Sequence, residues 1–339
     1  MKVELFVPCI IDQFFPEVAI DTFKILKRTD VEVEYNPEQT CCGRFAYNAG
    51  FLEEAKELGD KFLNDFSYEG PVVAPSAACV HYIRKRYPEL FFNTANHLNF
   101  KRMVANIYEL TDFLVNQLHF DDFGAEFPHK VTFHDSCSAL GGLGLGKEAR
   151  QLLSKVKGLE LVEMKQTDMC CGADFSMQAE HEALAVGMAS HKVKNALNTG
   201  AEYIVSTDMT CLMHQKAYIE KAGLPIKVIH IASLEDRYFT AISNSDTGEV
   251  SDETIFSYHQ KGNVIWAEYS GGSIIKGFLL GTIDDNNNLH FDYRHINTDG
   301  ESRSGSCNSK PVLENGKLRF YEHWKWTDGC EGTSVIEEI

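Results

Sequence analysis

The feature that most constrains this chain is a pair of matched cysteine sets, each built around two adjacent cysteines followed by glycine. In the first set, 31 residues separate Cys9 from the Cys41–Cys42 pair, and 36 residues separate that pair from Cys79. The same order recurs further along the chain with separations of 32 and 39 residues. Self-similarity of this kind indicates an internal structural repeat. The cysteines of the second set are Cys137, Cys170, Cys171 and Cys211.

The segments between the cysteines alternate between strand and helix patterns. Short apolar runs precede Cys9, the Cys41–Cys42 pair and Cys79, and amphipathic segments lie between them. The second set repeats this order. Strand–helix–strand alternation predicts parallel strands joined by right-handed crossovers. We therefore expect an α/β fold with two pseudo-symmetric, Rossmann-like CCG repeats, each with its own parallel sheet.

This topology brings distant cysteines together. The carboxyl ends of parallel strands share one edge of a sheet, and ligands bind there. Adjacent side chains diverge in a regular strand, so both thiols of a Cys–Cys pair face one site only at a turn or a helix start. Gly43 and Gly172 permit such a turn. We predict that four cysteines in each repeat bind a metal or cofactor, namely Cys9, Cys41, Cys42, Cys79, Cys137, Cys170, Cys171 and Cys211.

Composition favours metal-bound thiols over disulfides. The N-terminal segment is too short and too acidic for a signal peptide, and no apolar run reaches the length of a membrane span, so a cytoplasmic location without a transmembrane segment is expected. Structural disulfides are rare in that compartment, yet the chain has 10 cysteines. Four thiolates from distant loops suit a [4Fe-4S] cluster, and zinc stays an alternative although the usual short C-x-x-C knuckles are absent. Cys307 and Cys330 match neither set and are expected to be bystanders.

The charge of the chain excludes one class of partner. Asp and Glu number 49 against 32 Lys and Arg, which gives a formal net charge of -17. Nucleic acids and anionic membranes require a basic protein surface. We therefore expect no nucleic-acid partner.

The residues around the cysteines resemble a known family. The segments "LFVPCIIDQF", "CCGRFAYNAG", "PSAACV" and "LLSKVKGLELVEM" are similar to the cysteine-rich CCG family, which includes the cysteine-rich component of heterodisulfide reductase and the iron-sulfur component of glycolate oxidase. Within it, the chain most resembles the lactate utilization branch. The resemblance implies two [4Fe-4S] clusters and electron transfer during the oxidation of L-lactate, or another 2-hydroxy acid, to the keto acid. It also implies other iron-sulfur subunits of a lactate utilization complex as partners.

Two departures from the family pattern narrow this expectation. The heterodisulfide reductase pattern closes with Cys-x-x-Cys, whereas only Cys79 stands there in this chain. The lactate branch can show Cys-x-Cys near its end, and only Cys211 is kept. Five-cysteine clusters are therefore less supported, but four ligands per repeat suffice for one cluster each. The alternative is a non-redox scaffold with structural zinc at one or both sites and a C-terminal segment that recruits a partner.

Three histidines lie next to proposed ligands. His134 precedes Cys137, and His81 and His214 follow the last cysteine of each set. Such a histidine could tune a bound metal group or relay protons. A lone histidine is more often structural or solvent-facing, and we expect that role here.

The C-terminal segment has a different character. Residues 1–125 and 126–242 are expected to form the two repeats, and residues 243–339 a separate all-β domain. Short alternating apolar segments separated by turn signals predict an antiparallel barrel or meander there. This segment resembles a small all-β family of unclear function. Its three tryptophans are expected to pack in the core.

Overall fold

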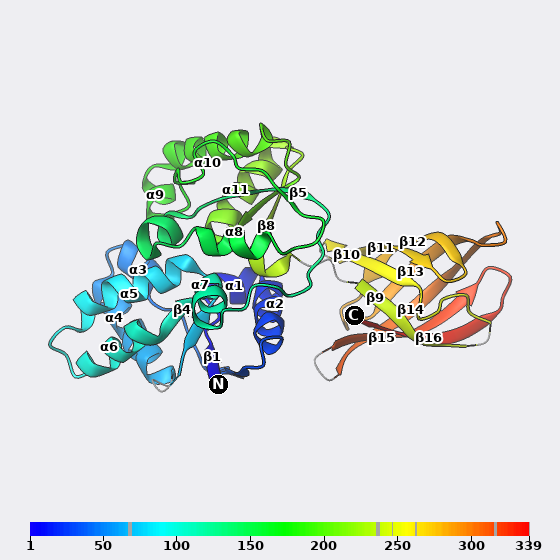
Figure 1. Ribbon diagram of the computed structural model, residues 1–339, viewed down its shortest axis with the longest axis horizontal. Helices are drawn as coiled ribbons and strands as arrows, with labels where there is room; N and C mark the ends of the chain where they lie inside the picture. The colour runs from blue at the N-terminus through cyan, green and yellow to red at the C-terminus, as the bar shows by residue number, and fades with distance from the viewer. Residues whose placement is uncertain (67–69, 235–237, 246, 262, 315–316, 339) are drawn as a thin grey trace. The chain divides into compact units, whose positions relative to one another are not determined.

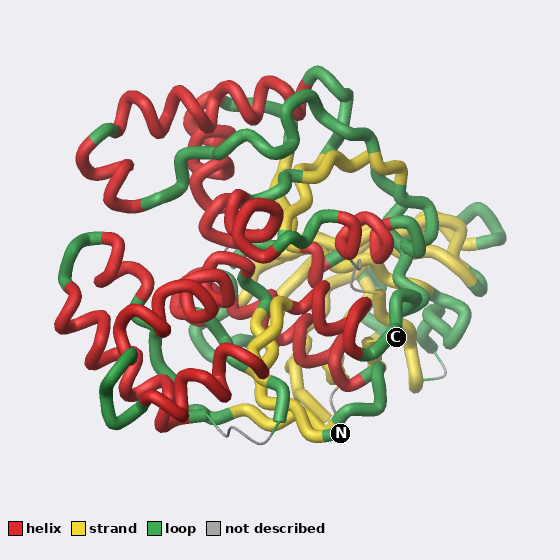
Figure 2. Tube along the Cα trace, turned by 60° about the vertical axis from the view of Figure 1, so that its left-hand side comes forward, coloured by secondary structure: helices red, strands yellow, loops and turns green. Residues whose placement is uncertain are grey.

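The chain divides into two compact units, residues 1–235 and 236–339. The computed structural model describes residues 1–66, 70–234, 238–245, 247–261, 263–314 and 317–338. The described residues of the second unit form strands and turns, whereas the helices lie in the first unit (Figure 2). The strands of the second unit begin at Tyr238, before the boundary expected at residue 243, because the polar segment there ends a strand and turns into the next. Among the described residues, no helix is long and apolar enough to cross a membrane.

The first sheet of the α/β unit, of which β1 and β4 are labelled in Figure 1, has four parallel strands in the order β2-β1-β3-β4. Its strands are β1 (Lys2–Leu5), β2 (Glu32–Tyr35), β3 (Val72–Ala74) and β4 (Ile107–Glu109). The connecting helices are α1 (Cys9–Phe14), α2 (Pro16–Lys27), α3 (Arg44–Asn48), α4 (Leu52–Asp65), α5 (Ala77–Phe91), α6 (His97–Asn106), α7 (Leu110–Asp112) and η1 (Phe113–Gln117).

The second sheet repeats this plan with the order β6-β5-β7-β8, again all parallel. Its strands are β5 (Lys130–Phe133), β6 (Glu160–Leu161), β7 (Tyr203–Ser206) and β8 (Lys227–His230). Its helices are η2 (Ser138–Leu143), α8 (Lys147–Leu153), α9 (Phe175–Glu180), α10 (Glu182–Leu197), α11 (Met209–Ala222) and η3 (Ile231–Ser233). The predicted fold of two pseudo-symmetric repeats with parallel sheets is confirmed. One sheet lies before residue 125 and the other after residue 126. The division into repeats 1–125 and 126–242 stays a prediction.

The second unit is a closed antiparallel barrel of eight strands, which decides between the predicted barrel and meander. Its strands are β9 (Tyr238–Asn244), β10 (Ile255–Lys261), β11 (Val264–Gly271), β12 (Ile274–Ile283), β13 (Leu289–Asn297), β14 (Ser302–Glu314), β15 (Lys317–Trp326) and β16 (Glu331–Glu338). Side chains alternate between the two faces, as in β11, where every second residue is buried. Trp324 and Trp326 lie in the barrel core, as expected for packing residues. The expectation is wrong for Trp266, which stands at an outward position of β11 and is exposed.

Strand burial fixes where the cysteines lie. The residues of β3 are fully buried, and those of β5 and β7 nearly so, because helices cover these central strands. The loops after the strands therefore emerge at the carboxyl edge of each sheet.

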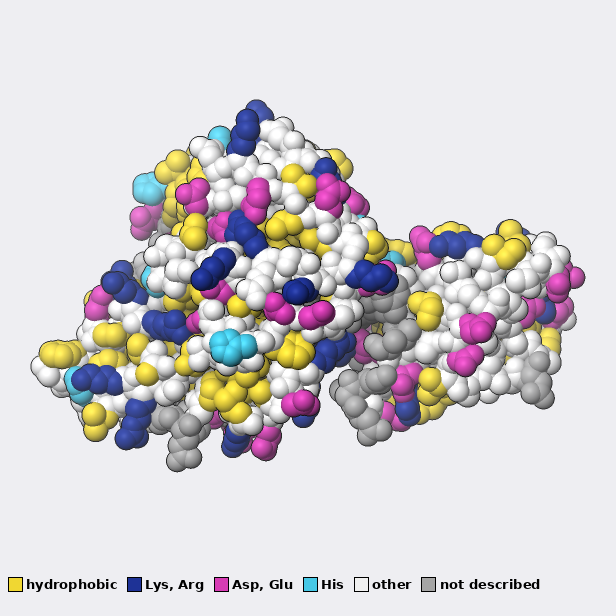
Figure 3. All heavy atoms as spheres, viewed as in Figure 1, with side chains coloured by type: hydrophobic (Ala, Val, Ile, Leu, Met, Phe, Trp, Pro, Cys, Tyr) yellow, Lys and Arg dark blue, Asp and Glu magenta, His cyan; other side chains and the backbone are white. Residues whose placement is uncertain are grey.

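On the face shown in Figure 3, basic and acidic side chains are interspersed.

Candidate metal centres

The first cysteine set lies at the carboxyl edge of the first sheet. Cys9 begins α1 directly after β1, the Cys41–Cys42 pair follows β2, and Cys79 lies in the first turn of α5 after β3. The Sγ atoms of Cys9 and Cys41 are 3.6 Å apart. The thiol of Cys42 is hydrogen-bonded to both Cys41 and Cys79. The structure thus brings together all four predicted ligands of this repeat.

The second cysteine set has the same arrangement. Cys137 follows β5 at the start of η2, the Cys170–Cys171 pair follows β6, and Cys211 lies in the first turn of α11 after β7. The sulfur of Cys170 accepts hydrogen bonds from Cys137 and Cys171. Cys171 is also hydrogen-bonded to Cys211. All four predicted ligands of the second repeat are therefore contiguous as well.

The cysteine thiols within each set differ in pKa. Hydrogen bonds from Cys42 and then from Cys9 lower the pKa of Cys41, and hydrogen bonds from Cys137 and then from Cys171 lower the pKa of Cys170. A thiolate is the form that binds metal ions. The first cysteine of each CCG triplet therefore favours the thiolate form that a metal ion needs.

The glycine of each triplet makes this geometry possible. Gly43 has φ +89° and Gly172 has φ +80°, in the left-handed region that glycine favours. A Cβ on Gly43 would lie 2.8 Å from the carbonyl oxygen of Ala55, and one on Gly172 would lie 2.7 Å from that of Ala185. Each glycine N–H also donates to the sulfur two residues earlier, at 3.4 Å in both repeats. A larger residue would collide with this carbonyl and distort the turn that directs both thiols toward the site.

Helix caps hold the last cysteine of each set. The Ser76 hydroxyl accepts from the Cys79 N–H at the start of α5. In the second repeat, Asp208 caps α11 by accepting from the Thr210 N–H at 3.0 Å. Its other carboxylate oxygen accepts from the Ala78 N–H at 2.8 Å. Asp208 therefore ties the helix that carries Cys79 to the helix that carries its counterpart.

Arg44 lies between the two cysteine sets, and its position was not predicted from the sequence. It is almost fully buried, and its Nη2 donates to the hydroxyl of Thr210 at 3.1 Å. Its Nε has no partner among the described atoms. Burial alone would lower the pKa of Arg44, but the negative charges of Cys79, Asp208 and cysteines of both sets raise it. Its place directly after the CCG glycine was the available signal.

A cleft with a volume of about 230 Å³ opens beside the second set. Arg44, His81, Lys85 and Arg86 supply basic side chains to its wall. The cysteines that line it are Cys137, Cys170, Cys171 and Cys211. Cys137 is exposed, whereas Cys171 and Cys211 are buried. The cleft therefore gives small molecules access to the second centre.

The three histidines next to the cysteines have different surroundings. His214 is engaged structurally, because its Nε2 donates to the Ala185 carbonyl at 3.1 Å. His81 lines the cleft, with its ring packed against Gly142. His134 is fully buried, and one of its nitrogens lies within 4.8 Å of the sulfurs of Cys171 and Cys211. Burial lowers the pKa of His134 to about 3.

The donor chemistry fits a metal or iron-sulfur group. Each repeat offers four sulfurs, and a thiolate-rich set from spread-out loops suits zinc or iron-sulfur ligation. The glycine turns leave no room for a Cβ. The ring of His134, which has no partner in the part of the chain that the structure describes, faces the second set. In the barrel, Cys307 is buried in the core and Cys330 lies in the turn after β15.

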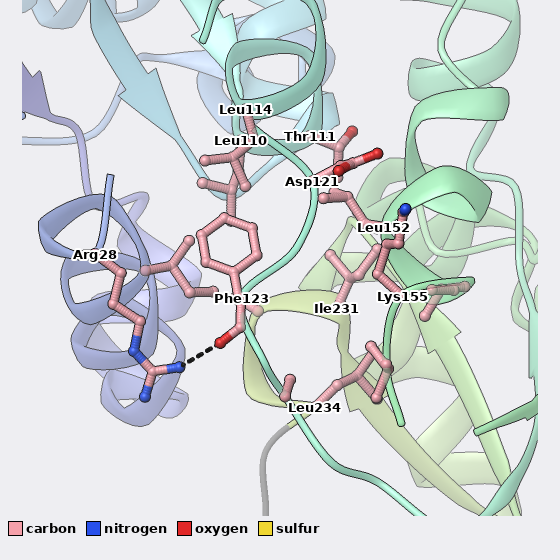
Figure 4. A pocket seen from close by; sticks show the side chains of 15 residues that line it. Arg28, Leu110, Thr111, Leu114, Asp121, Phe123, Leu152, Lys155, Ile231 and Leu234 are labelled. Atoms are coloured by element: carbon pink, nitrogen blue, oxygen red, sulfur yellow. Dashed lines mark hydrogen bonds between the residues drawn. The ribbon is translucent and has the colours of Figure 1, made fainter. Parts of the chain in front are cut away.

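Another cavity of the first unit, about 60 Å³ in volume, has a mainly apolar lining (Figure 4). Leu110, Phe123 and Leu234 contribute to it, and the Arg28 guanidinium donates to the Phe123 carbonyl at 3.4 Å. This lining offers apolar contact rather than soft metal ligands.

Comparison with known proteins agrees with the two-repeat interpretation. The cysteine-rich domain family matches residues 3–84 and 131–216, and the avidin-like protein family matches residues 232–339. Lactate utilization protein A of Geobacillus thermodenitrificans is 37% identical over 235 residues, covering 69% of this chain and 98% of that protein. Lactate utilization protein A 1 of Bacillus mycoides is 36% identical over 243 residues, covering 70% of this chain and 98% of that protein.

Solved structures are more distant. A hypothetical protein from Helicobacter pylori has a TM-score of 0.48 and 10% identity, over 68% of this chain and 47% of that one. That likeness is too weak to inform the fold or the site. The family evidence comes from the sequence relatives, and it confirms the resemblance seen around the cysteines. The chain belongs to the lactate utilization protein A family and carries its cysteine-rich domain twice.

Proposed function

We propose that this chain is an iron-sulfur electron-transfer subunit of an L-lactate, or related 2-hydroxy acid, oxidation complex. One observation carries the proposal: each repeat gathers four sulfurs at the carboxyl edge of its sheet, in contacts that run from the first cysteine of the set to the last. The names of its relatives supply the substrate class. The eight proposed ligands are the four cysteines of each set.

In this proposal the chain carries the electrons of the oxidation one at a time. Oxidation of lactate to pyruvate releases two electrons and two protons. A bound [4Fe-4S] cluster in each repeat would accept and release one electron at a time. The chain contributes the thiolates, the glycine N–H groups that donate to Cys41 and Cys170, and the charge of Arg44. Burial of Cys42 and Cys171 keeps water away from the inner side of each centre.

Electron carriers need a donor and an acceptor. We propose that these are other iron-sulfur subunits of a lactate utilization complex, and that the complex works in the cytoplasm. The many reduced thiols support this compartment, since cytoplasmic thiols are kept reduced. The exposed Cys137 in the cleft marks a place where one partner or a small molecule can approach.

A non-redox scaffold with zinc is the second candidate. It is favoured by one observation, the close grouping of His134, Cys171 and Cys211, because mixed imidazole and thiolate ligands suit zinc. Measurement of iron, acid-labile sulfide and zinc after anaerobic purification decides between the two. The proposal expects about eight iron atoms and as many sulfides per chain. Zinc at both sites without sulfide would establish the scaffold instead.

A further inference from the structure

Phe6 and His134 occupy the same place in the two repeats. Each lies three residues before the first cysteine of its set. The N–H of Phe6 donates to the Val73 carbonyl at 2.9 Å, and the N–H of His134 donates to the Val205 carbonyl at 2.8 Å. Both side chains are fully buried. The repeats therefore place a phenyl ring and an imidazole at one structural position.

A second exchange accompanies the first. Phe62 of α4 and Lys192 of α10 each lie seven residues beyond the alanine whose carbonyl the CCG glycine meets. In the first repeat, the rings of Phe6 and Phe62 meet edge to face at 4.9 Å. In the second repeat, Lys192 is fully buried and its Nζ donates to the carbonyls of Gln166 and Thr167. An aromatic pair thus becomes an imidazole and an amine.

The imidazole of His134 is buried without a hydrogen-bond partner among the described residues. Neither ring nitrogen is paired within the described part of the chain. A buried N–H without an acceptor is destabilising, and each such group calls for a specific explanation such as a bound ion. The sulfurs of Cys171 and Cys211 lie within 4.8 Å of one ring nitrogen. In either protonation state, the ring carries an N–H that can face the group these sulfurs hold.

We propose that His134 donates a hydrogen bond to the sulfur of the group bound at the second centre and gives that centre a higher reduction potential than the first. This inference rests on the proposed electron-transfer function. Reduction adds a negative charge, which a hydrogen-bond donor stabilises, and hydrogen bonds to sulfur are one determinant of cluster potential. The amine of Lys192 lies close enough to interact with the charges of Cys171 and Cys211. The phenyl rings of the first repeat offer neither contribution.

The direction of electron flow follows from this difference. An electron moves spontaneously from the centre of lower potential to the centre of higher potential. The first repeat is then the side that receives electrons, and the second repeat, with its open cleft and exposed Cys137, is the side that passes them on. Arg44 does not create the difference, because its charge interacts with cysteines of both sets.

The test is a redox titration of the anaerobically purified full chain, followed by electron paramagnetic resonance. The variant H134F copies the first repeat, and H134Q keeps an N–H donor. H134F is expected to retain its iron and sulfide and to lower the reduction equilibrium constant of one centre about tenfold, which is ~59 mV for a one-electron couple. H134Q is expected to recover part of this loss. The exposed His191 on α10 provides the control, and H191F should leave both potentials unchanged.

The reciprocal variant F6H places an imidazole at the first centre and should raise the lower potential. It also keeps the test decisive where H134F fails to fold. An unchanged pair of potentials in both H134F and F6H overturns the inference while leaving the proposed function intact. Loss of iron from the second centre of folded H134F also overturns it, since His134 would then be a ligand. Absence of iron and sulfide from the unaltered chain overturns the proposed function itself.

Discussion

The two repeats of the first unit share a backbone and differ in the side chains behind their cysteines. In both, the CCG glycine has a positive φ and meets a helix carbonyl, and the last cysteine lies in the first turn of a helix. Around this frame, Phe6 and Phe62 of the first repeat are replaced by His134 and Lys192. The comparison teaches that ligand positions depend on backbone geometry, which both repeats keep. The side chains behind the ligands are free to diverge, and they set how each centre behaves.

Loss of one cysteine should have the largest effect on metal content. It also tests the two centres one at a time. Serine is a poor iron ligand at neutral pH, so Cys42→Ser should empty the first centre and Cys171→Ser the second. Each variant is expected to keep about half of the iron and sulfide, and the double variant should lose both metal and lactate-dependent electron flow. Cys307→Ser in the barrel core is the matched control and should keep the full metal content. Full turnover by the double variant would contradict the electron-transfer proposal.

Replacement of the CCG glycine tests the shared backbone. Ala at Gly43 or Gly172 meets both an unfavourable φ and a backbone carbonyl closer than 3.0 Å. We expect each substitution to lower the free energy of unfolding by about 4 kcal/mol, as the sum of backbone strain and steric displacement. Gly50 is the control, since it has φ +86° with nothing within 4 Å, and Gly50→Ala should cost only about 1–2 kcal/mol. Equal losses at Gly43 and Gly50, measured by denaturant unfolding, would show that packing at the turn is unimportant.

The predictable and unpredictable parts of this molecule differ in a physical way. The cysteine spacing located the carboxyl ends of the strands because parallel strands share an edge, and all eight proposed ligands lie there. The sequence also marked His134, but its approach to Cys211 arises only when β5 and β7 pair. Arg44 has the same property, because its partner Thr210 comes from the other repeat.

Strand β14 of the barrel is hard to predict for a different reason. Residues 302–310 of this strand are polar and serine-rich, and they lack the large apolar residues by which strands are recognised. Among the positions of β14 whose burial is described, the buried ones are Gly305, Cys307 and Ser309. Two of them pair with large residues of β15, Gly305 with Trp326 and Cys307 with Trp324. Buried and exposed positions still alternate along the strand, but the buried residues are small. Their size is explained by the large residues of β15 that lie opposite them.

The two repeats also differ in the residue that ends the last strand of each sheet, β4 in the first repeat and β8 in the second. Glu109 ends β4 and accepts from the Thr111 N–H, and His230 ends β8 and accepts from the Ala232 N–H. Burial raises the pKa of Glu109 to about 7 and lowers the pKa of His230 to about 4. The stability linked to Glu109 is therefore present below pH 4.5 and lost as the pH rises toward 7. The stability linked to His230 is present above pH 6.5 and lost as the pH falls toward 4.

Variants of these two residues should change the pH dependence of the free energy of unfolding in opposite directions. Relative to the unaltered chain, Glu109→Gln is expected to raise the free energy of unfolding by about 3 kcal/mol more at pH 8 than at pH 4.5. His230→Asn should raise it by a similar amount more at pH 4 than at pH 7. Denaturant unfolding of the metal-free chain between pH 4 and pH 8 measures both. Parallel profiles for the two variants would contradict the opposite roles of the two caps.

Replacement of Arg44, which has the smallest expected effect, tests whether the two centres share one charge. Its guanidinium interacts with Cys42 and Cys79 of the first set and with Cys211 of the second, so Arg44→Gln should change both centres together. Removing such a charge behind metal ligands costs about tenfold in metal affinity. Competitive titration of the metal-free chain with Zn²⁺ should therefore show weaker binding at both sites. Arg44→Lys should recover most of the affinity if the charge is the cause, and Arg86→Gln, in the same cleft wall but paired with Glu89, should change neither site. Weakening confined to one site would mean that Arg44 belongs to one repeat only, and that the two centres are not electrostatically joined.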